Sequence, residues 1–252
     1  MSQAAVHYRE IQDPEDPALA PAQLLYEATL DAAERIPWRW IVEAVAQRRT
    51  WRPGRWSPHL LVAARRTRRG PVGRVVGFAY GAHLRGYGGY ACYLGVAPRH
   101  RRRGIATRLL QELVEAFRAD AAAEGASLPF VIWESREPGP DASPAEREQW
   151  QARLRLFARL GAFWVAGLTF LAPNFSRRGG EAVPLQLFLL PVDTRPEDFD
   201  AESLREVAAG LMRRVYRRDE GDPLFRQTFS SFRRPALQPV TVLRDLSTAH
   251  RR

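Results

Sequence analysis

A cluster of arginines stands immediately before a glycine near the middle of the chain. Residues 98–107 read Pro-Arg-His-Arg-Arg-Arg-Gly-Ile-Ala-Thr, followed by an apolar pattern with helical spacing. The first turn of a helix carries backbone N–H groups without intrahelical partners and a partial positive charge, so phosphate is its natural ligand. Gly104 lets a ligand approach the backbone, and Ala106 keeps the first turn uncrowded. Arg102 and Arg103 would add charge-assisted contacts, so the stretch predicts a site for a pyrophosphate.

Two other interpretations of this stretch, a solvated basic turn and a nucleotide-binding loop, explain its spacing less well. A solvated basic turn ahead of an ordinary helix accounts for the arginines. It does not explain why the spacing Arg101-x-x-Gly104-x-Ala106 occurs between an apolar strand and an apolar helix. A nucleotide-binding loop does not fit, because the sequence contains no Gly-x-x-x-x-Gly-Lys and Gly86-x-Gly88-Gly89 leads into a strand. The spacing therefore favours a phosphate site.

The elements that position this stretch follow from apolar periodicity. Tyr90–Val96 reads as a strand ahead of it, and a helix runs from about Gly104 to Glu124. Leu128–Trp133 reads as a buried strand after the helix, and this strand–helix–strand unit is long enough for a right-handed parallel crossover. Further strands are expected at His7–Gln12, His59–Ala64, Arg74–Ala82, Ala162–Leu171 and Val183–Leu190, and further helices at Pro21–Glu34, Trp38–Gln47, Pro144–Leu160 and Ala201–Tyr216.

These elements predict an α/β fold with a single mixed sheet. Neighbouring strands joined by short turns, such as the one expected at Gly70–Gly73, are antiparallel, and the crossover pair is parallel. Helices are expected on both faces of the sheet. The helix Ala201–Tyr216 forms a C-terminal extension, and the polar tail from Arg217 is expected to be less ordered.

Composition favours a cytoplasmic protein without membrane contact. The 252 residues are 45% hydrophobic and 26% charged, and no segment reaches the ~18 uninterrupted apolar residues of a membrane helix. Cys92 is the only cysteine, which excludes an internal disulfide and fits a reducing compartment. Residues 1–17 lack the basic and then apolar pattern of a secretion signal.

The net charge of +10 raises the question of nucleic-acid binding. All 38 basic residues are arginine, which with abundant alanine is typical of G+C-rich coding sequence as much as of a protein that binds a polyanion. No basic stripe interleaved with aromatic residues and no recognition-helix motif accompanies the charge. We therefore expect no nucleic-acid partner.

The motif and its surroundings resemble the GNAT superfamily of N-acetyltransferases. Arg101-x-x-Gly104-x-Ala106, after Leu94-Gly95-Val96, is similar to the signature Arg/Gln-x-x-Gly-x-Gly/Ala. Leu156–Phe163, which reads Leu-Phe-Ala-Arg-Leu-Gly-Ala-Phe, looks like the family's second motif, a helix end that runs into Leu-Gly-Phe. The order of elements is similar from about residue 6 to 191. The resemblance implies an acyl-CoA-binding catalytic domain at 1–195 and a C-terminal helix and tail extension at 196–252.

The resemblance implies that an amine attacks the thioester of acetyl-CoA directly in a ternary complex. By similarity, the pantetheine arm lies between the strands Tyr90–Val96 and Leu128–Trp133 and bonds to the backbone of Leu94 and Val96. The Leu94 N–H would polarise the thioester carbonyl, a catalytic role that needs a fixed donor. The implied cofactor-binding residues are Leu94, Gly95, Val96, Arg101, Arg102, Arg103, Gly104, Ile105, Ala106 and Thr107.

Two positions depart from the family's pattern. Phe157 stands where the family usually has a tyrosine that protonates the leaving thiolate, and phenylalanine has no proton to give. Tyr90 stands at the strand position where some members keep a glutamate base. Either another group or solvent carries the proton, or the chain is a GNAT-fold module that binds acyl-CoA without turnover.

Glu134 is the candidate base. It stands just past the apolar strand and beside Trp133, where apolar surroundings would suit a carboxylate that accepts the ammonium proton directly or through water. The alternative is a structural carboxylate paired with a surface arginine. Glu137 and Asp141, in the following loop, are further candidates for the same role.

The sequence does not identify the amine acceptor or the role of the C-terminal extension. Nothing in the sequence distinguishes a small-molecule amine from a peptide amine. The helix Ala201–Tyr216 could cover the sheet edge, close the acceptor site or mediate a homodimer. The five histidines show no metal-ligand spacing, so no metal is expected.

Overall fold

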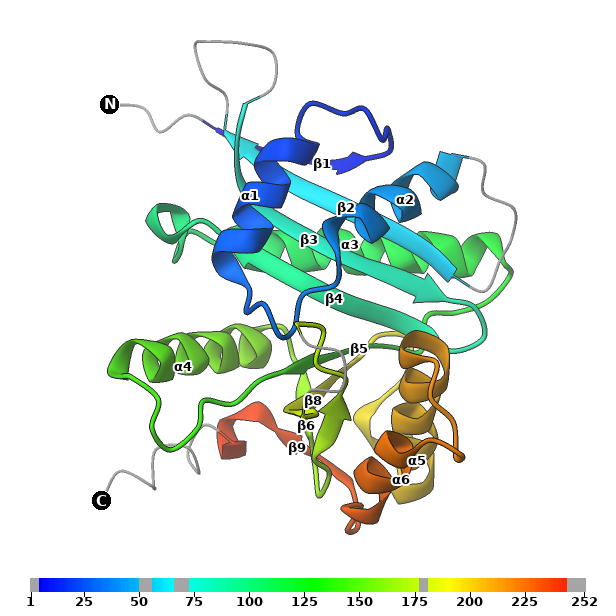
Figure 1. The fold of residues 1–252 in the computed structure, drawn as a ribbon. Helices are drawn as coiled ribbons and strands as arrows, with labels where there is room; N and C mark the ends of the chain where they lie inside the picture. The colour runs from blue at the N-terminus through cyan, green and yellow to red at the C-terminus, as the bar shows by residue number, and fades with distance from the viewer. Residues whose placement is uncertain (1–4, 50–55, 66–72, 177–180, 244–252) are drawn as a thin grey trace. The chain divides into compact units, whose positions relative to one another are not determined.

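The computed structural model describes residues 5–49, 56–65, 73–176 and 181–243 (Figure 1). The chain divides into two compact units, Met1–Leu128 and Pro129–Arg252, each with its own strands and helices. Most of the turn expected at Gly70–Gly73 lies outside the described residues. Within them, no helix has both the length and the apolar character needed to cross a membrane.

Four antiparallel strands form the sheet of the first unit, in the order β1-β2-β3-β4. Their bounds are Val6–Ile11 for β1, Trp56–Arg65 for β2, Arg74–Leu84 for β3 and Gly88–Val96 for β4. β2 and β3 are buried along most of their length, so both faces of this sheet are covered. Each strand lies where the sequence pattern predicted one.

Three helices cover this sheet from both sides, as Figure 1 shows. Their bounds are Leu19–Thr29 for α1, Trp38–Arg49 for α2 and Ile105–Ala123 for α3. A side chain at Gly95 would collide with Thr29 of α1, whereas one at Gly77 would collide with Ile105 and Leu109 of α3. α3 is the long helix predicted after the arginine cluster, and its apolar face packs on β2, β3 and β4.

The second unit contains the remaining strands, in the order β5-β8-β6-β9, with β7 paired to β8. Their bounds are Phe130–Ser135 for β5, Phe163–Ala166 for β6, Phe170–Ala172 for β7, Val183–Pro191 for β8 and Ala236–Pro239 for β9. All pairs within this unit are antiparallel. β8 is the central strand, because β5, β6 and β7 all pair with it.

The single strand predicted at Ala162–Leu171 is wrong, because Gly167 divides it into β6 and β7. Gly167 has a left-handed backbone, with φ +78°. A β-carbon there would lie 2.4 Å from the carbonyl oxygen of Arg233, and the Arg233 N–H donates to the Gly167 carbonyl at 2.9 Å. The chain turns at this glycine to make room for a segment that arrives much later in the sequence.

The helices of the second unit are α4 (Pro144–Arg159), α5 (Ala201–Leu211) and α6 (Pro223–Ser230), and a π-helical turn over Met212–Tyr216 continues α5. α4 begins at a capping box, in which the Ser143 side chain accepts from the Glu146 N–H and the Glu146 carboxylate accepts from the Ser143 N–H. The glycine after α4, Gly161, has φ +79°, as expected for a helix end.

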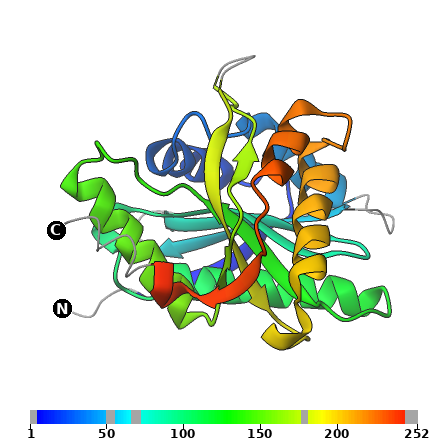
Figure 2. The same cartoon turned by 90° about the horizontal axis from the view of Figure 1, so that it is seen from below.

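The tail from Arg217 was expected to be less ordered, and this expectation is wrong for the residues up to 243. α6 buries Phe225 and Phe229, and β9 pairs with β6 between Ala236 and Ala166. In Figure 2, α6 is orange and β9 is red. A helix of eight residues and a strand of four leave too short an apolar pattern to be recognised from sequence.

Candidate functional site

The loop between β4 and α3 is open at its glycine. Gly104 is the residue before the first turn of α3 and has φ +76°, and a β-carbon built on it would have no heavy atom within 4 Å. Arg102 also has a left-handed backbone, with φ +62°. A non-glycine residue in this region costs about 1 kcal/mol, and such residues gather at ligand sites. The two left-handed residues curl the exposed loop around the N-terminus of α3.

The backbone N–H groups of this loop are available to a ligand. The helical hydrogen bonds begin at Arg108, whose N–H donates to the Gly104 carbonyl at 3.0 Å. Within the described residues, the N–H groups of residues 103–107 donate to no protein acceptor. An array of unsatisfied donors at the positive end of a 19-residue helix is suited to an anion.

The arginines of the loop have different surroundings. The Arg101 Nε donates to the carbonyl of Val96 at 3.2 Å, so this side chain ties the loop back to the end of β4. Arg102 and Arg103 are exposed, as is Gly104. The structure therefore assigns Arg101 a bracing contact, and the side chains of Arg102 and Arg103 lie at the surface.

The electrostatic potential beside the loop is positive. Partial burial and the charges of Arg103, Arg65 and Arg74 together lower the pKa of His100, which stands in the same loop. These arginines come from the loop, the end of β2 and the start of β3. Basic side chains of three elements thus face one region, which favours a polyanionic ligand.

β4 carries the predicted backbone contacts and is irregular just before them. Leu94–Val96 pairs with Gly77–Ala79 of β3, and the register shifts between Tyr80 and Gly81, which leaves Cys92 as an extra residue in β4. Such bulges bend a strand and often stand beside sites. Leu94 and Val96 are half-buried, and Gly95 is buried.

Gly95 is fixed by packing within the first unit. A β-carbon at this position would lie 2.3 Å from the ring of Phe78 and 2.6 Å from the Thr29 hydroxyl. The Tyr93 hydroxyl, two residues earlier, donates to the Glu34 carbonyl at 2.8 Å and accepts from the Ile36 N–H at 3.0 Å. β4 is therefore held rigidly between β3 and the segment that joins α1 to α2.

Glu134 lies inside β5, opposite Leu187 of β8, and not just past the strand as the sequence suggested. Successive side chains on a strand point to opposite faces, so Trp133 does not surround its carboxylate. The Trp133 ring packs instead against Phe157, at 5.2 Å between centroids, and stacks on Phe188 at 6.3 Å. Trp133 thus packs in the aromatic cluster, on the face of β5 away from the Glu134 side chain.

The partner of Glu134 is a tyrosine that sequence reasoning missed. The hydroxyl of Tyr216, in the π-helical turn after α5, donates to the Glu134 Oε1 across 82 residues of sequence. The Tyr216 ring also lies 5.6 Å from that of Phe170 in β7. The sequence placed Tyr216 at the end of an amphipathic helix but carried no signal for the strand that it would meet.

The buried aromatic cluster under α4 contains a hydrogen-bond donor without an acceptor. Phe157 is 5% exposed and packs on Phe188 at 4.7 Å, with Trp150 nearby. The Nε1 of Trp133, also 5% exposed, has no hydrogen-bond partner within the described residues. Phe157 thus sits in a buried aromatic environment.

The two further candidate bases differ in their surroundings. Glu137 accepts a hydrogen bond from the Gln186 Nε2 at 2.9 Å, and Gln186 in turn accepts from the Trp164 Nε1 at 2.9 Å. This chain ties the loop after β5 to β6 and β8, so Glu137 has a structural role. Asp141 is exposed. No group of His, Cys, Asp and Glu side chains that could hold a metal ion occurs among the described residues.

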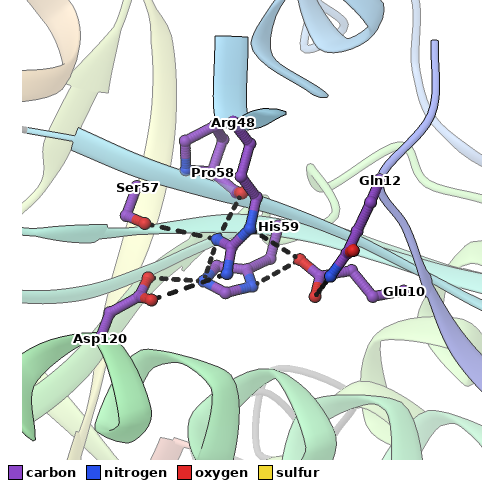
Figure 3. Close-up of polar contacts among 7 residues, drawn as sticks. All are labelled: Glu10, Gln12, Arg48, Ser57, Pro58, His59 and Asp120. Carbon is purple, nitrogen blue, oxygen red and sulfur yellow. Dashed lines mark hydrogen bonds and ion pairs between the residues drawn. The ribbon is translucent and has the colours of Figure 1, made fainter. Parts of the chain in front are cut away.

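A second polar cluster, drawn in Figure 3, lies in the first unit and was not predicted. His59 of β2 is 1% exposed and bridges two carboxylates: its Nδ1 lies 2.8 Å from the Glu10 Oε1 and its Nε2 2.7 Å from the Asp120 Oδ2. Arg48 of α2 lies 3.3 Å from Glu10 and 3.6 Å from Asp120. Its Nη1 also donates to the carbonyl of Pro58 at 2.9 Å. The cluster joins β1, α2, β2 and α3 through charged groups.

The two carboxylates of this cluster favour a charged His59, and Arg48 opposes it. Burial and the charge of Arg48 would lower the pKa of His59, but its contacts with Asp120 and Glu10 outweigh both and raise it. Burial would raise the pKa of both carboxyls, but their bonds to His59 and the charge of Arg48 lower it. The arrangement favours an imidazolium between two carboxylates, and every member is committed to a protein partner. This cluster therefore has a stabilising role in the first unit.

The sequence of residues 23–131 matches the model of the acetyltransferase (GNAT) family. This range contains the loop before α3, the bulged strand β4 and the start of β5. No protein among the curated sequences matches the chain.

Several solved structures share the fold. A GNAT-family protein from Bacteroides thetaiotaomicron has a TM-score of 0.54 at 15% identity, over 83% of this chain and 98% of that one. Arabidopsis thaliana NAA60, solved with acetyl-CoA, has a TM-score of 0.51 at 16% identity, over 75% of this chain and 99% of that one. The same plant protein with a bisubstrate analogue also has a TM-score of 0.51, at 17% identity, over 76% and 100% of the two chains.

The sequence match covers part of the chain, and the solved structures share its fold. Residues 23–131 are therefore similar to the GNAT family of acetyltransferases, and the chain has the GNAT fold. The predicted fold class, an α/β mixed sheet of the GNAT type, is confirmed by the likeness to the Bacteroides thetaiotaomicron structure.

Proposed function

We propose that the protein is an acyl-CoA-dependent N-acyltransferase. It moves an acetyl group, or another short acyl group, from coenzyme A to a primary amine by direct attack in a ternary complex. The observation that carries this proposal is the open N-terminus of α3, where the N–H groups of residues 103–107 have no protein acceptor among the described residues. The match of residues 23–131 to the model of an acetyltransferase family supports coenzyme A as the phosphate-bearing ligand.

The loop residues bind the cofactor in this proposal. The pyrophosphate accepts from the N–H groups of residues 103–107, and Arg102 and Arg103 add charge-assisted contacts to the phosphates. Gly104 leaves the space that this approach requires. The contact from Arg101 to Val96 supports a role in holding the loop in shape beside its predicted contact with the cofactor.

The backbone of β4 holds the reactive end of the cofactor. The N–H of Leu94 donates to the thioester carbonyl, and Gly95 and Val96 keep the strand in place. The packing of Gly95 against Phe78 and Thr29 supports this role, because an oxyanion donor must be rigid to be effective. A fixed donor and a positioned amine supply catalysis without a covalent enzyme intermediate.

Glu134 acts as the base. The amine nitrogen forms a bond to the thioester carbon, its extra proton passes to the Glu134 carboxylate directly or through water, and the carbon–sulfur bond breaks to release the thiolate of coenzyme A. The position of Glu134 in a paired strand supports this role, since strand residues are held more precisely than loop residues. Solvent protonates the thiolate, because Phe157 has no proton to donate.

The partner is a small-molecule or peptide amine, and the catalytic unit spans residues 1–195. The single cysteine supports a cytoplasmic location. We expect no nucleic-acid or membrane partner, because the positive charge of the sequence is not accompanied by a nucleic-acid recognition motif or a long apolar segment.

Calorimetry tests the cofactor site. We expect acetyl-CoA to bind with micromolar affinity, and duplex DNA to bind weakly and with a steep dependence on salt. Tight DNA binding that persists at 200 mM salt, without binding of acetyl-CoA, would contradict the proposal.

A thiol-release assay over a panel of amines tests turnover. The chain contains no lysine, so its own side chains offer no primary amine to compete with the added acceptor. We expect thiol release that depends on one class of amine, at rates of about 1 s⁻¹ or more. Binding of acetyl-CoA without release for any amine would instead identify a binding module, the alternative that Phe157 favours.

A further inference from the structure

We propose that Tyr216 is a positioning residue for Glu134, so that the C-terminal extension supplies part of the catalytic apparatus. The inference rests on the proposed role of Glu134 as the base. It starts from the hydrogen bond that the Tyr216 hydroxyl donates to the Glu134 Oε1. Both residues belong to the second unit, so their contact is internal to one compact body.

Glu134 is fixed at its backbone and its side chain is held by the tyrosine. β5 pairs with β8 along its whole length, with Glu134 opposite Leu187. This pairing sets the direction of the carboxylate but leaves its torsions free. A hydroxyl donor on one oxygen removes much of that freedom, because a hydrogen bond to an ionised carboxylate is among the stronger hydrogen bonds. Tyr216 therefore selects one orientation of the carboxylate.

Tyr216 is itself well anchored. It ends a continuous helical run that begins at Ala201, where the Asp200 side chain caps α5 by accepting from the Ser203 N–H. The π-helical turn keeps Met212 fully buried and ends at Arg217, which has φ +56°. The Arg218 N–H donates back to the Met212 carbonyl at 3.1 Å. Single π-helical turns are rare and occur often at functional sites.

The ring of Tyr216 has a packing partner that does not depend on its hydroxyl. Phe170 of β7 lies 5.6 Å from it, between ring centroids. Replacement of Tyr216 by phenylalanine therefore removes the hydrogen bond and keeps the aromatic contact. This makes Tyr216→Phe a clean probe of the hydroxyl.

The hydrogen bond has a chemical consequence for a base. A hydroxyl that donates to a carboxylate stabilises the ionised form, so the carboxylate is ready to accept a proton at lower pH. A contact that only ties the extension to β5 would have no such effect on turnover. The two roles therefore differ in the pH dependence of the reaction and not only in stability.

The test compares the pH profile of kcat/KM for the wild type, Tyr216→Phe, Glu134→Gln and the double variant. We expect Tyr216→Phe to move the acid limb of the profile up by about one pH unit, which lowers kcat/KM about tenfold on that limb, with the KM for acetyl-CoA unchanged. The double variant should lose no more activity than Glu134→Gln alone, because the hydroxyl acts through that carboxylate.

Tyr8→Phe is the matched control, since the Tyr8 hydroxyl of β1 has no hydrogen bond within the described residues. We expect the pH profile of this variant to match that of the wild type.

A second readout does not depend on turnover. With ¹³C-labelled glutamate, the carboxyl resonance that disappears in Glu134→Gln belongs to Glu134, and its titration midpoint should rise in Tyr216→Phe. If the wild type releases no thiol with any amine, the proposed function has failed, and the midpoint alone decides whether Tyr216 holds Glu134. An unchanged midpoint overturns the inference, and so does a Tyr216→Phe profile that coincides with that of Tyr8→Phe.

Discussion

At the scale of single residues, Gly104 decides whether an anion can reach the start of α3. We predict that Gly104→Glu abolishes acetyl-CoA binding, a loss of at least a hundredfold in affinity, because it places bulk and negative charge against the N–H groups of residues 103–107. Isothermal titration calorimetry measures this directly.

A glutamate at position 104 also strains the backbone, since Gly104 has φ +76°. Gly125 provides a matched control, because it has φ +71° at the other end of α3 and equally open space around it. Gly125→Glu should cost a similar stability of about 1 kcal/mol and leave acetyl-CoA affinity unchanged. Equal loss of affinity in both variants would show that the binding site lies elsewhere.

Glu134 is the second single residue on which the proposed function depends, because it is the proposed base. Glu134→Gln keeps the shape of the side chain but removes its basicity, so we predict a fall in kcat of about a hundredfold or more with acetyl-CoA affinity intact. The acid limb of the pH profile should disappear, as stopped-flow thiol release over pH 5–9 would measure.

Glu137→Gln is the control for this assignment, because Glu137 is bonded to Gln186 and its amide analogue keeps an oxygen for that bond. We expect near-normal turnover. Loss of turnover in Glu137→Gln and its retention in Glu134→Gln would move the base to the loop.

At the scale of elements, the close contact of β3 with β4 and α3 depends on Gly81. A β-carbon there would lie 2.4 Å from the Tyr90 carbonyl and 2.9 Å from the ring of Phe117. Backbone cannot move aside as a side chain can, so we predict that Gly81→Ala lowers the free energy of unfolding by about 3 kcal/mol. Urea denaturation measures the loss. Gly139→Ala, in open space, should be neutral, and equal stability of the two variants would argue against the β3–β4 packing described.

Elements with a long apolar period were predictable from the sequence, and the contacts between distant elements were not. α3 and α4 begin and end within a few residues of their expected bounds, because a proline or glycine marks one end and apolar spacing marks the body. The loop before α3 combined a strand, a glycine and a helix within twelve residues, so its site was visible locally. Its role in cofactor binding stays a prediction.

The surroundings of Glu134 could not be predicted from the apolar periodicity of the sequence. Its strand was predicted to end at Trp133, two residues before its actual end at Ser135, and strand ends carry little signal when pairing and not side-chain type sets them. Tyr216 is far away in sequence, and the Glu10–His59–Asp120 cluster likewise gathers residues from three separate elements. Such partnerships arise from the topology, which a periodic pattern does not specify.

At the scale of the whole molecule, the cluster around His59 makes stability depend on pH. Its pKa is raised in the folded state, so its contribution is complete below the unfolded value of about 6.5 and is lost as the pH rises through the folded value. We predict that the free energy of unfolding of the wild type falls as the pH rises above about 6.5. His59→Gln should lose about 3 kcal/mol at pH 6.5 and show a flatter curve above it. Thermal and urea unfolding over this range measure both quantities.

His83 serves as the control for this effect, because it is also buried and its pKa shifts in the opposite direction. Burial lowers the pKa of His83, so its protonation opposes folding below about pH 6.5 and has no effect above it. His83→Gln should therefore keep the decline above pH 6.5. If the His59→Gln curve retains that decline as well, the imidazolium between Glu10 and Asp120 is not its source.

The pairing of β9 with β6 also bears on how the protein is made. The ribosome completes β6 at Ala166, but its partner begins only at Ala236, which at about 5–20 residues per second arrives roughly 4–14 s later. During that interval the outer edge of β6 presents unpaired N–H and C=O groups to any other nascent chain. The first unit has by then been fully translated, so the second is the part of the newborn polypeptide most exposed to misassembly and most in need of a chaperone.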